Sequence, residues 1–161
     1  MTLTNVPFRN LFFFLAIVPT MAASLIVDTT PSLHPLKEHG EVTSSFGPAV
    51  NPFTQKNQIH RGVDFRAPEG TEVFATADAR VVTADENATM GIHIVLQHDD
   101  TYETVYAHLS ALEVQEGETV RSGDLIGRVG NTGLSKGPHL HYEVHVKGDA
   151  VNPEDFLPAG R

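Results

Sequence analysis

The chain has 161 residues and a formal net charge of −9, with 40% hydrophobic and 19% charged residues. This length suits one domain with a real core, and the composition is that of a globular protein. The acidic balance argues against nucleic acid or another polyanion as a partner. Cysteine is absent, which excludes disulfides and thiolate metal sites and leaves histidines and carboxylates as the only strong metal ligands.

The N-terminus has the pattern of a secretory signal peptide. Arg9 precedes an apolar run over residues 11–18, and small residues follow at the positions that a signal peptidase reads, ending at Ala22. The apolar run is about half the roughly 20 residues that a spanning helix needs, which disfavours an uncleaved anchor. We expect residues 1–22 to be removed on export to the periplasm or the cell exterior, leaving no stable membrane anchor.

The rest of the chain divides into segments of different amino-acid composition. Residues 23–42 are polar and punctuated by prolines, and we expect them to form a lead-in segment. The domain is predicted over residues 43–157, and residues 158–161 form a short tail. Short apolar runs separated by glycine and proline predict a mainly β domain with little helix beyond one closing turn.

Two hairpins are predicted inside the domain. The first joins residues 73–75 to residues 80–83, and the second joins residues 92–97 to residues 102–107 through a polar turn. Residues 51–59 are expected to be a polar loop.

Two histidines share one predicted strand. The run around His139-Leu140-His141 mixes apolar and ring-bearing residues, and side chains on a strand alternate between its faces. His139 and His141 should therefore point to one side and Leu140 to the other. Such a pair also fits a polar sheet face on which histidines only form hydrogen bonds.

Other residues complete a candidate metal site. His60 and Asp64 lie four residues apart on an extended or looped segment and can face the same way, although a salt-bridged surface loop fits as well. A catalytic zinc site needs three protein ligands and one open position, so His60, Asp64 and one histidine of the pair would suffice. The other histidine and His108 could then transfer protons. Spacing alone does not decide which histidine of the pair holds the metal.

Five motifs together give the chain a family resemblance. It resembles the lysostaphin/LytM-type zinc metalloendopeptidases, which cleave peptide cross-links of bacterial peptidoglycan. The motifs occur in the family's order over residues 43–157 and are Ser45-Phe46-Gly47, His60-x-x-x-Asp64, Tyr106-Ala107-His108-Leu109, Val120-x-x-Gly123-x-x-Ile126-Gly127, and Gly133 with Gly137-Pro138-His139-Leu140-His141-Tyr142-Glu143.

The resemblance implies a fold, a cofactor and a substrate. The fold would be a small antiparallel β-barrel or two-sheet groove, and one Zn²⁺ would be bound by His60, Asp64 and His141. His108 and His139 would polarise the attacking water or stabilise the tetrahedral intermediate, and which of them is the base stays open. The partners implied are peptidoglycan stem peptides and cross-bridges, and we expect a monomer.

Alternatives differ in the residues they require. A non-catalytic wall-binding module, or an activator of another wall hydrolase, would be favoured by lost ligands, but all five positions are intact. The glycine-rich motif over residues 117–127 also resembles biotinyl and lipoyl carrier hairpins, yet no lysine for attachment lies between Asn57 and Lys136.

One departure from the family concerns the substrate. Many relatives carry an arginine soon after Phe-Gly, where this chain has Pro48-Ala49-Val50. This difference affects the expected contacts with the cell-wall substrate and not the zinc or general-base residues. Direct D-alanyl cross-links are preferred over glycine bridges because the chain is acidic and shows no attached wall-binding domain.

The remaining histidines are expected to pack or to be solvated. They are His34, His39, His93, His98 and His145. Glu143 alternates with His141 along the strand, so its carboxylate could accept a hydrogen bond from a metal-bound imidazole.

Overall fold

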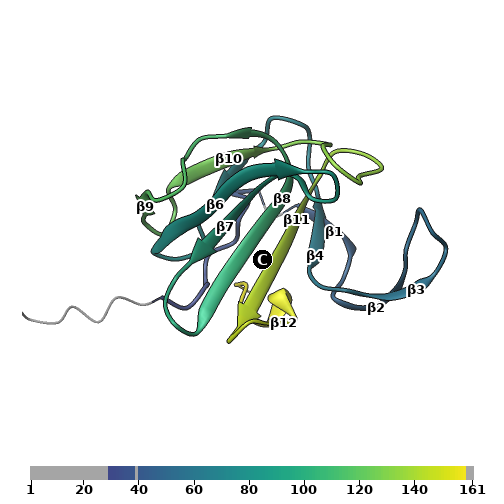
Figure 1. Ribbon diagram of the computed structural model, residues 1–161, viewed down its shortest axis with the longest axis horizontal. Coiled ribbons are helices and arrows are strands. Elements are labelled where there is room, and N and C mark those ends of the chain that lie inside the picture. Colours follow the sequence, from purple (N-terminus) through teal and green to yellow (C-terminus); the bar gives the residue numbers. More distant parts are fainter. Residues whose placement is uncertain (1–28, 39, 159–161) are drawn as a thin grey trace, which may run out of the picture.

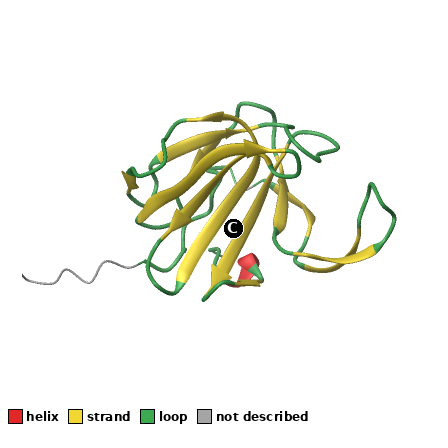
Figure 2. Cartoon of the chain, in the orientation of Figure 1, coloured by secondary structure: helices red, strands yellow, loops and turns green. Residues whose placement is uncertain are grey.

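The computed structural model describes residues 29–38 and 40–158, so the predicted signal peptide and His39 lie outside the described residues. In this part of the chain nearly all regular structure is strand, and no helix has the length and apolar character to cross a membrane (Figure 2). The mainly β prediction is confirmed. The elements are β1 (Glu41–Ser44), β2 (Gly47–Val50), β3 (Asn57–His60), β4 (Val63–Arg66), β5 (Glu72–Phe74), β6 (Ala79–Asn87), β7 (Gly91–Gln97), β8 (Tyr102–Leu112), β9 (Thr119–Val120), β10 (Leu125–Val129), β11 (His139–Val146), β12 (Asp149–Val151) and the 3-10 turn η1 (Pro153–Asp155).

One large antiparallel sheet carries the domain. Its main order is β1-β4-β11-β8-β7-β6-β9, with β10 beside β5 and β8, and β12 beside β11. The strands β2 and β3 form a separate two-stranded sheet that extends away from this body (Figure 1). Because β11 pairs with β4 on one side and β8 on the other, the three segments predicted to carry the site lie next to one another.

The two faces of β11 have different roles. Leu140, Tyr142 and Val144 are fully buried and belong to the hydrophobic core, where burial of each side chain contributes roughly 2 kcal/mol. His139 and His141 alternate with them and point to the opposite face, as strand geometry predicted. The core face thus anchors the strand whose other face carries the histidines.

Two local predictions are wrong. Residues 73–75 and 80–83 do not form a hairpin, because β5 pairs with β10 and β6 pairs with β7 and β9. The chain between them bends at residues 76–78, and Ala75, Thr76 and Ala77 are buried. The expected loop over residues 51–59 ends in a strand, because β3 pairs with β2. The second predicted hairpin, β7 with β8, is confirmed.

The segment before β1 contributes to the core. Leu36 has only 1% of its surface exposed and packs within the hydrophobic cluster. The backbone N–H of Phe74 donates to the carbonyl of Pro35 at 2.9 Å, which holds this segment beside β5.

A buried polar network connects several strands on the core side. The hydroxyl of Thr76 lies 3.0 Å from that of Tyr106 and 3.1 Å from that of Tyr142. Thr104 extends the network to His98, whose Nε2 is 2.8 Å from the Thr104 hydroxyl and whose Nδ1–H donates to the carbonyl of Asp78 at 2.9 Å. Each polar group therefore has a partner, as burial requires.

His98 should make stability depend on pH. Burial lowers the pKa of His98 below 6.5, although the hydrogen bond to the Asp78 carbonyl opposes this shift. As the pH falls below about 6.5, the unfolded chain binds a proton that the folded chain resists, so this contribution to stability is lost with acidification. In urea unfolding between pH 7.5 and 5, the stability advantage of wild type over His98→Gln should shrink as the pH falls. A constant difference would contradict this assignment.

Candidate metal centre and active site

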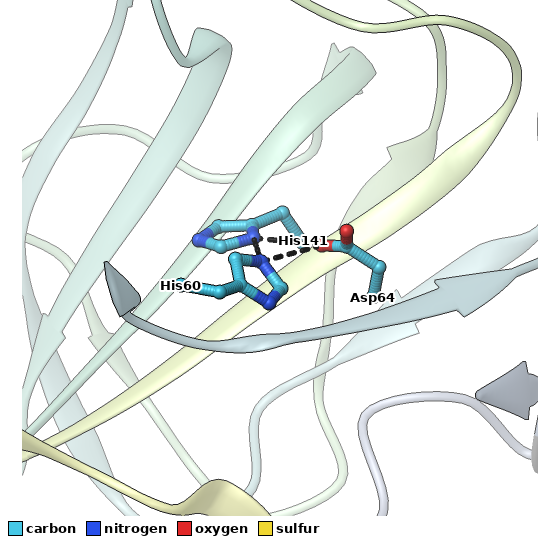
Figure 3. A group of neighbouring side chains, drawn as sticks. All are labelled: His60, Asp64 and His141. Carbon is cyan, nitrogen blue, oxygen red and sulfur yellow. Dashed lines mark hydrogen bonds and ion pairs between the residues drawn. The ribbon is translucent and has the colours of Figure 1, made fainter. Parts of the chain in front are cut away.

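Three predicted residues converge at one point. His60 ends β3, Asp64 lies on β4 and His141 lies on β11 directly opposite Asp64. Asp64 Oδ1 is 2.8 Å from His141 Nδ1 and 3.3 Å from His60 Nε2, and the two nitrogen atoms are 3.2 Å apart (Figure 3). A Cβ at Gly62 would lie 2.4 Å from the carbonyl of Tyr142, so glycine lets this segment approach β11 closely.

The donor set fits a zinc ion. Tetrahedral zinc with bonds of about 2.0–2.1 Å separates neighbouring ligand atoms by about 3.3 Å. The separations of His60 Nε2 from Asp64 Oδ1 and from His141 Nδ1, 3.3 and 3.2 Å, are close to that value, and the third is shorter at 2.8 Å. Two imidazole nitrogens and one carboxylate oxygen are also the ligand types that zinc accepts when thiolates are absent. Within the described residues this is the one group of at least three such side chains close enough to hold a metal.

Hydrogen bonds to the far ring nitrogens orient both imidazoles. Nδ1 of His60 lies 3.0 Å from the carbonyl of Ser45, to which it donates when protonated. Nε2 of His141 is 3.0 Å from Glu143 Oε1, which is the contact expected for Glu143. A proton on each far nitrogen leaves the lone pairs of His60 Nε2 and His141 Nδ1 directed at the shared point.

The other two predicted site histidines lie beside this group. The rings of His108 and His139 have centroids 4.8 Å apart, and His108 is 6.0 Å from the ring of His141. Nδ1 of His108 donates to the carbonyl of Thr132 and Nδ1 of His139 to that of Gly137, each at 2.8 Å. Their Nε2 atoms are therefore available to a substrate or a water molecule. The structure brings all five predicted residues into one cluster.

Charges and burial set different protonation states in the cluster. Burial alone would raise the pKa of the Asp64 carboxyl, but hydrogen bonds from His141 and His60 hold it well below its usual range. Burial disfavours the charged form of His141, yet Asp64 and Glu143 outweigh it and raise its pKa to about 9. Burial lowers the pKa of His108 to about 4, so its ring is neutral at neutral pH.

A bulge in β8 directs His108 toward the cluster. Ala107 is opposite His141 and shares its face, so regular alternation would turn His108 toward the core. Instead β8 has one extra residue against β7, where Ile92 pairs with Leu109 and Ile94 pairs with Tyr106. His108 has φ of 62°, a left-handed conformation that costs a non-glycine residue about 1–2 kcal/mol. Strain of this kind is found where a side chain is held for function.

Comparisons with known proteins place the chain in a family. The model of peptidase family M23 matches residues 58–153, a range that holds every residue of the cluster. The chain belongs to peptidase family M23. It is 45% identical over 122 residues to an uncharacterized metalloprotease of Haemophilus influenzae, covering 74% of this chain and 26% of that protein. It is 41% identical over 120 residues to the peptidoglycan DD-endopeptidase ShyA of Vibrio cholerae, covering 74% of this chain and 28% of that protein.

A solved structure agrees with this assignment. The catalytic domain of lysostaphin from Staphylococcus simulans superposes with a TM-score of 0.68 at 31% identity, covering 74% of this chain and 92% of that domain. The expected resemblance to lysostaphin-type peptidases is confirmed. The chain spans about a quarter of the length of the two relatives above, so the similarity concerns their M23 region.

The loop that carries Thr132 is packed tightly in this M23 domain. The hydroxyl of Thr132 donates to the carbonyl of Leu109 at 2.7 Å and accepts from the N–H of Ile92 at 3.0 Å. A Cβ at Gly133 would lie 2.3 Å from the nitrogen of Gly91, and Gly133 has φ of 69°. The close backbone contact holds the carbonyl that orients His108.

Alanine at position 133 should therefore destabilise the domain and disturb His108. We expect Gly133→Ala to lower the free energy of unfolding by at least about 2 kcal/mol, because a left-handed residue and a backbone clash combine. Gly148→Ala is the matched control, since its φ is 87° but nothing lies within 4 Å of the added Cβ. That variant should lose only about 1 kcal/mol in urea unfolding. Equal losses would show that the Gly91 contact contributes nothing.

A cleft of about 1230 Å³ contains the cluster. One wall is the β2–β3 hairpin, which presents Val50, Phe53 and Ile59, and the other is the loop with Leu134 and Lys136. Nζ of Lys136 lies 5.4 Å from the ring centroid of Phe53, so the two walls of the cleft approach each other at these side chains. Sequence reasoning missed these wall residues. The available signal was an apolar residue, Phe53, exposed within a polar stretch.

The other histidines of the described residues lie outside the cluster. The ring of His93 contacts the carbonyl of Gly91 at 3.0 Å, His98 belongs to the core network, and His34 packs edge-on against Phe65. His145 instead contacts the carboxylates of Glu143 and Glu103. Packing thus accounts for His34, His93 and His98, whereas His145 is connected to the cluster through Glu143.

Proposed function

We propose that this chain is an exported zinc metalloendopeptidase that hydrolyses peptide cross-links of bacterial peptidoglycan. The observation that carries the proposal is the meeting of His60 Nε2, Asp64 Oδ1 and His141 Nδ1 beside two further histidines. Family membership supports it, because the match includes all of these positions.

In this proposal His60, Asp64 and His141 hold one Zn²⁺. When bound, the ion supplies a Lewis acid and lowers the pKa of a coordinated water to about 7. His108 and His139 present their Nε2 atoms to the cleft, with that of His139 3.9 Å from Asp64 Oδ1, so one accepts the proton of the attacking water and returns it to the leaving amine. The other, with a second proton on Nε2, donates a hydrogen bond to the oxyanion of the tetrahedral intermediate.

The decisive experiment uses purified sacculi. The zinc-reconstituted protein should release soluble muropeptides, and a chelator should stop the release until zinc is restored. Sacculi that stay intact with the zinc-reconstituted protein would overturn the proposal and favour a wall-binding or activating role.

We further propose direct D-alanyl cross-links as the bond that is cut. The relative ShyA, which is 41% identical to this chain, is named a peptidoglycan DD-endopeptidase. Sacculi with direct links and sacculi with glycine bridges, digested in parallel and analysed by mass, distinguish the two bonds. Cleavage of glycine bridges alone would contradict this choice.

Export, domain boundaries and oligomeric state complete the proposal. Residues 1–22 act as the signal peptide, residues 23–42 as a lead-in and residues 43–157 as the peptidase domain, which works as a monomer. N-terminal sequencing of the exported protein should begin at Ala23, and light scattering should give the mass of one chain.

A further inference from the structure

A line of side chains joined by hydrogen bonds and one ion-pair contact continues outward from His141. Glu143 faces Nε2 of His141 through Oε1 at 3.0 Å and faces Nε2 of His145 through Oε2 at 2.5 Å. Nδ1 of His145 is in turn 3.2 Å from Oε1 of Glu103. Four side chains thus form one path from the candidate zinc ligand to the far part of the sheet.

The sheet register produces this line. His141, Glu143 and His145 alternate on one face of β11, and His145 is directly opposite Glu103 on β8. Glu143 is 4% exposed and His145 is 9% exposed, whereas the Glu103 side chain is 32% exposed. A charged carboxylate is buried only where it is paired, and here both oxygens of Glu143 have a histidine partner.

We propose that Glu143 and His145 are positioning residues for the metal centre. The inference rests on the proposed function, since it assumes that His141 binds zinc through Nδ1. A single contact to Glu143 would fix the tautomer of His141 but leave the carboxylate free to rotate about its last side-chain torsion. His145 holds the second oxygen, and Glu103 holds His145 from the neighbouring strand.

The pair determines two properties of the His141 ring. Glu143 keeps a proton on Nε2, so Nδ1 is the atom that gives its lone pair to the metal once its own proton has left. The fixed plane of Glu143 keeps the ring aimed at Asp64 and His60. The metal-free site is therefore preorganised, and loosening the outer groups should weaken metal binding without removing a ligand.

Zinc affinity of the metal-free protein tests this inference. Competition with a chromophoric chelator measures the zinc Kd of wild type, Glu143→Gln, His145→Gln and Glu103→Gln. We expect Glu143→Gln to weaken zinc binding about 10- to 100-fold and His145→Gln about 10-fold, as loss of groups around a metal ligand does. Glu103→Gln should change the Kd by less than about 3-fold, because this residue is the most exposed of the line.

His98→Gln is the matched control, since His98 is a histidine of similar burial with no path to His141. It should leave the zinc Kd unchanged. A purely structural role for Glu143 and His145 would lower the melting temperature of the metal-free variants but keep the zinc Kd within about 3-fold of wild type, and that result would overturn the inference.

The absorption spectrum of the cobalt-substituted protein gives a second readout. The bands of Glu143→Gln should shift or broaden relative to wild type, because the His141 ring is less fixed, while those of His98→Gln should match wild type. Wild-type protein that binds no zinc would instead overturn the proposed metal site itself, so the two failures are distinguishable.

Discussion

We expect His141→Ala to remove the proposed zinc binding and peptidoglycan hydrolysis together. Of the two histidine nitrogens that face Asp64 Oδ1 in the cleft, Nδ1 of His141 is the closer, at 2.8 Å. The two ligands that remain are fewer than the three protein ligands that a catalytic zinc site needs. The loss of affinity should exceed the roughly 100-fold upper range that changes around a ligand produce. Metal content of the dialysed protein and muropeptide release measure the two effects.

The same substitution should destabilise the metal-free protein. Asp64 and Glu143 each lose one of the two histidines that lower the pKa of their carboxyl groups. His60 still contacts Asp64 and His145 still contacts Glu143, but each carboxylate loses one hydrogen bond, which costs on the order of 2 kcal/mol for a charged group. His93→Ala is the control, because His93 is a buried histidine outside the cluster and its loss should leave the zinc content intact. A His141→Ala protein that keeps one zinc per chain would refute the assigned ligand set.

His108→Ala separates chemistry from metal binding. His108 is not one of the three converging ligands, and its Nε2 is free because Nδ1 bonds to Thr132. Removing a general acid–base group costs about 10²- to 10⁴-fold in rate. We expect that loss in the hydrolysis rate with zinc still bound at one per chain. Unchanged hydrolysis would remove His108 from the mechanism, and loss of zinc would make it a ligand.

A second variant at this position tests the strain in β8. With φ of 62° at His108, alanine stays in an unfavourable conformation whereas glycine does not. In urea unfolding, the free energy of unfolding of His108→Gly should therefore be about 1 kcal/mol higher than that of His108→Ala, with both variants inactive. Equal stability of the two would show that the bulge stores no strain at this residue.

Local pattern in the chain was enough to predict the fold class and to name candidates for the cluster, while the full set of five residues was implied by the family resemblance. Alternation along a strand placed His139 and His141 on one face because it depends only on a period of two residues. Turn residues predicted the β7–β8 hairpin for the same local reason. The wrong prediction of a β5–β6 hairpin shows the limit of local pattern. The buried connection through Thr76 has no signature in the neighbouring residues.

The sequence by itself determined which residue types were available for a metal centre and that two histidines would share a face. Only the tertiary structure decided their arrangement. The register of β4 with β11 set His141, rather than His139, opposite Asp64, and pairing across 77 positions of sequence is invisible to local pattern. The bulge in β8 likewise placed His108 in the cluster, whereas regular alternation would have turned it toward the core. An extra residue in one of two paired strands reverses the alternation of side chains beyond it.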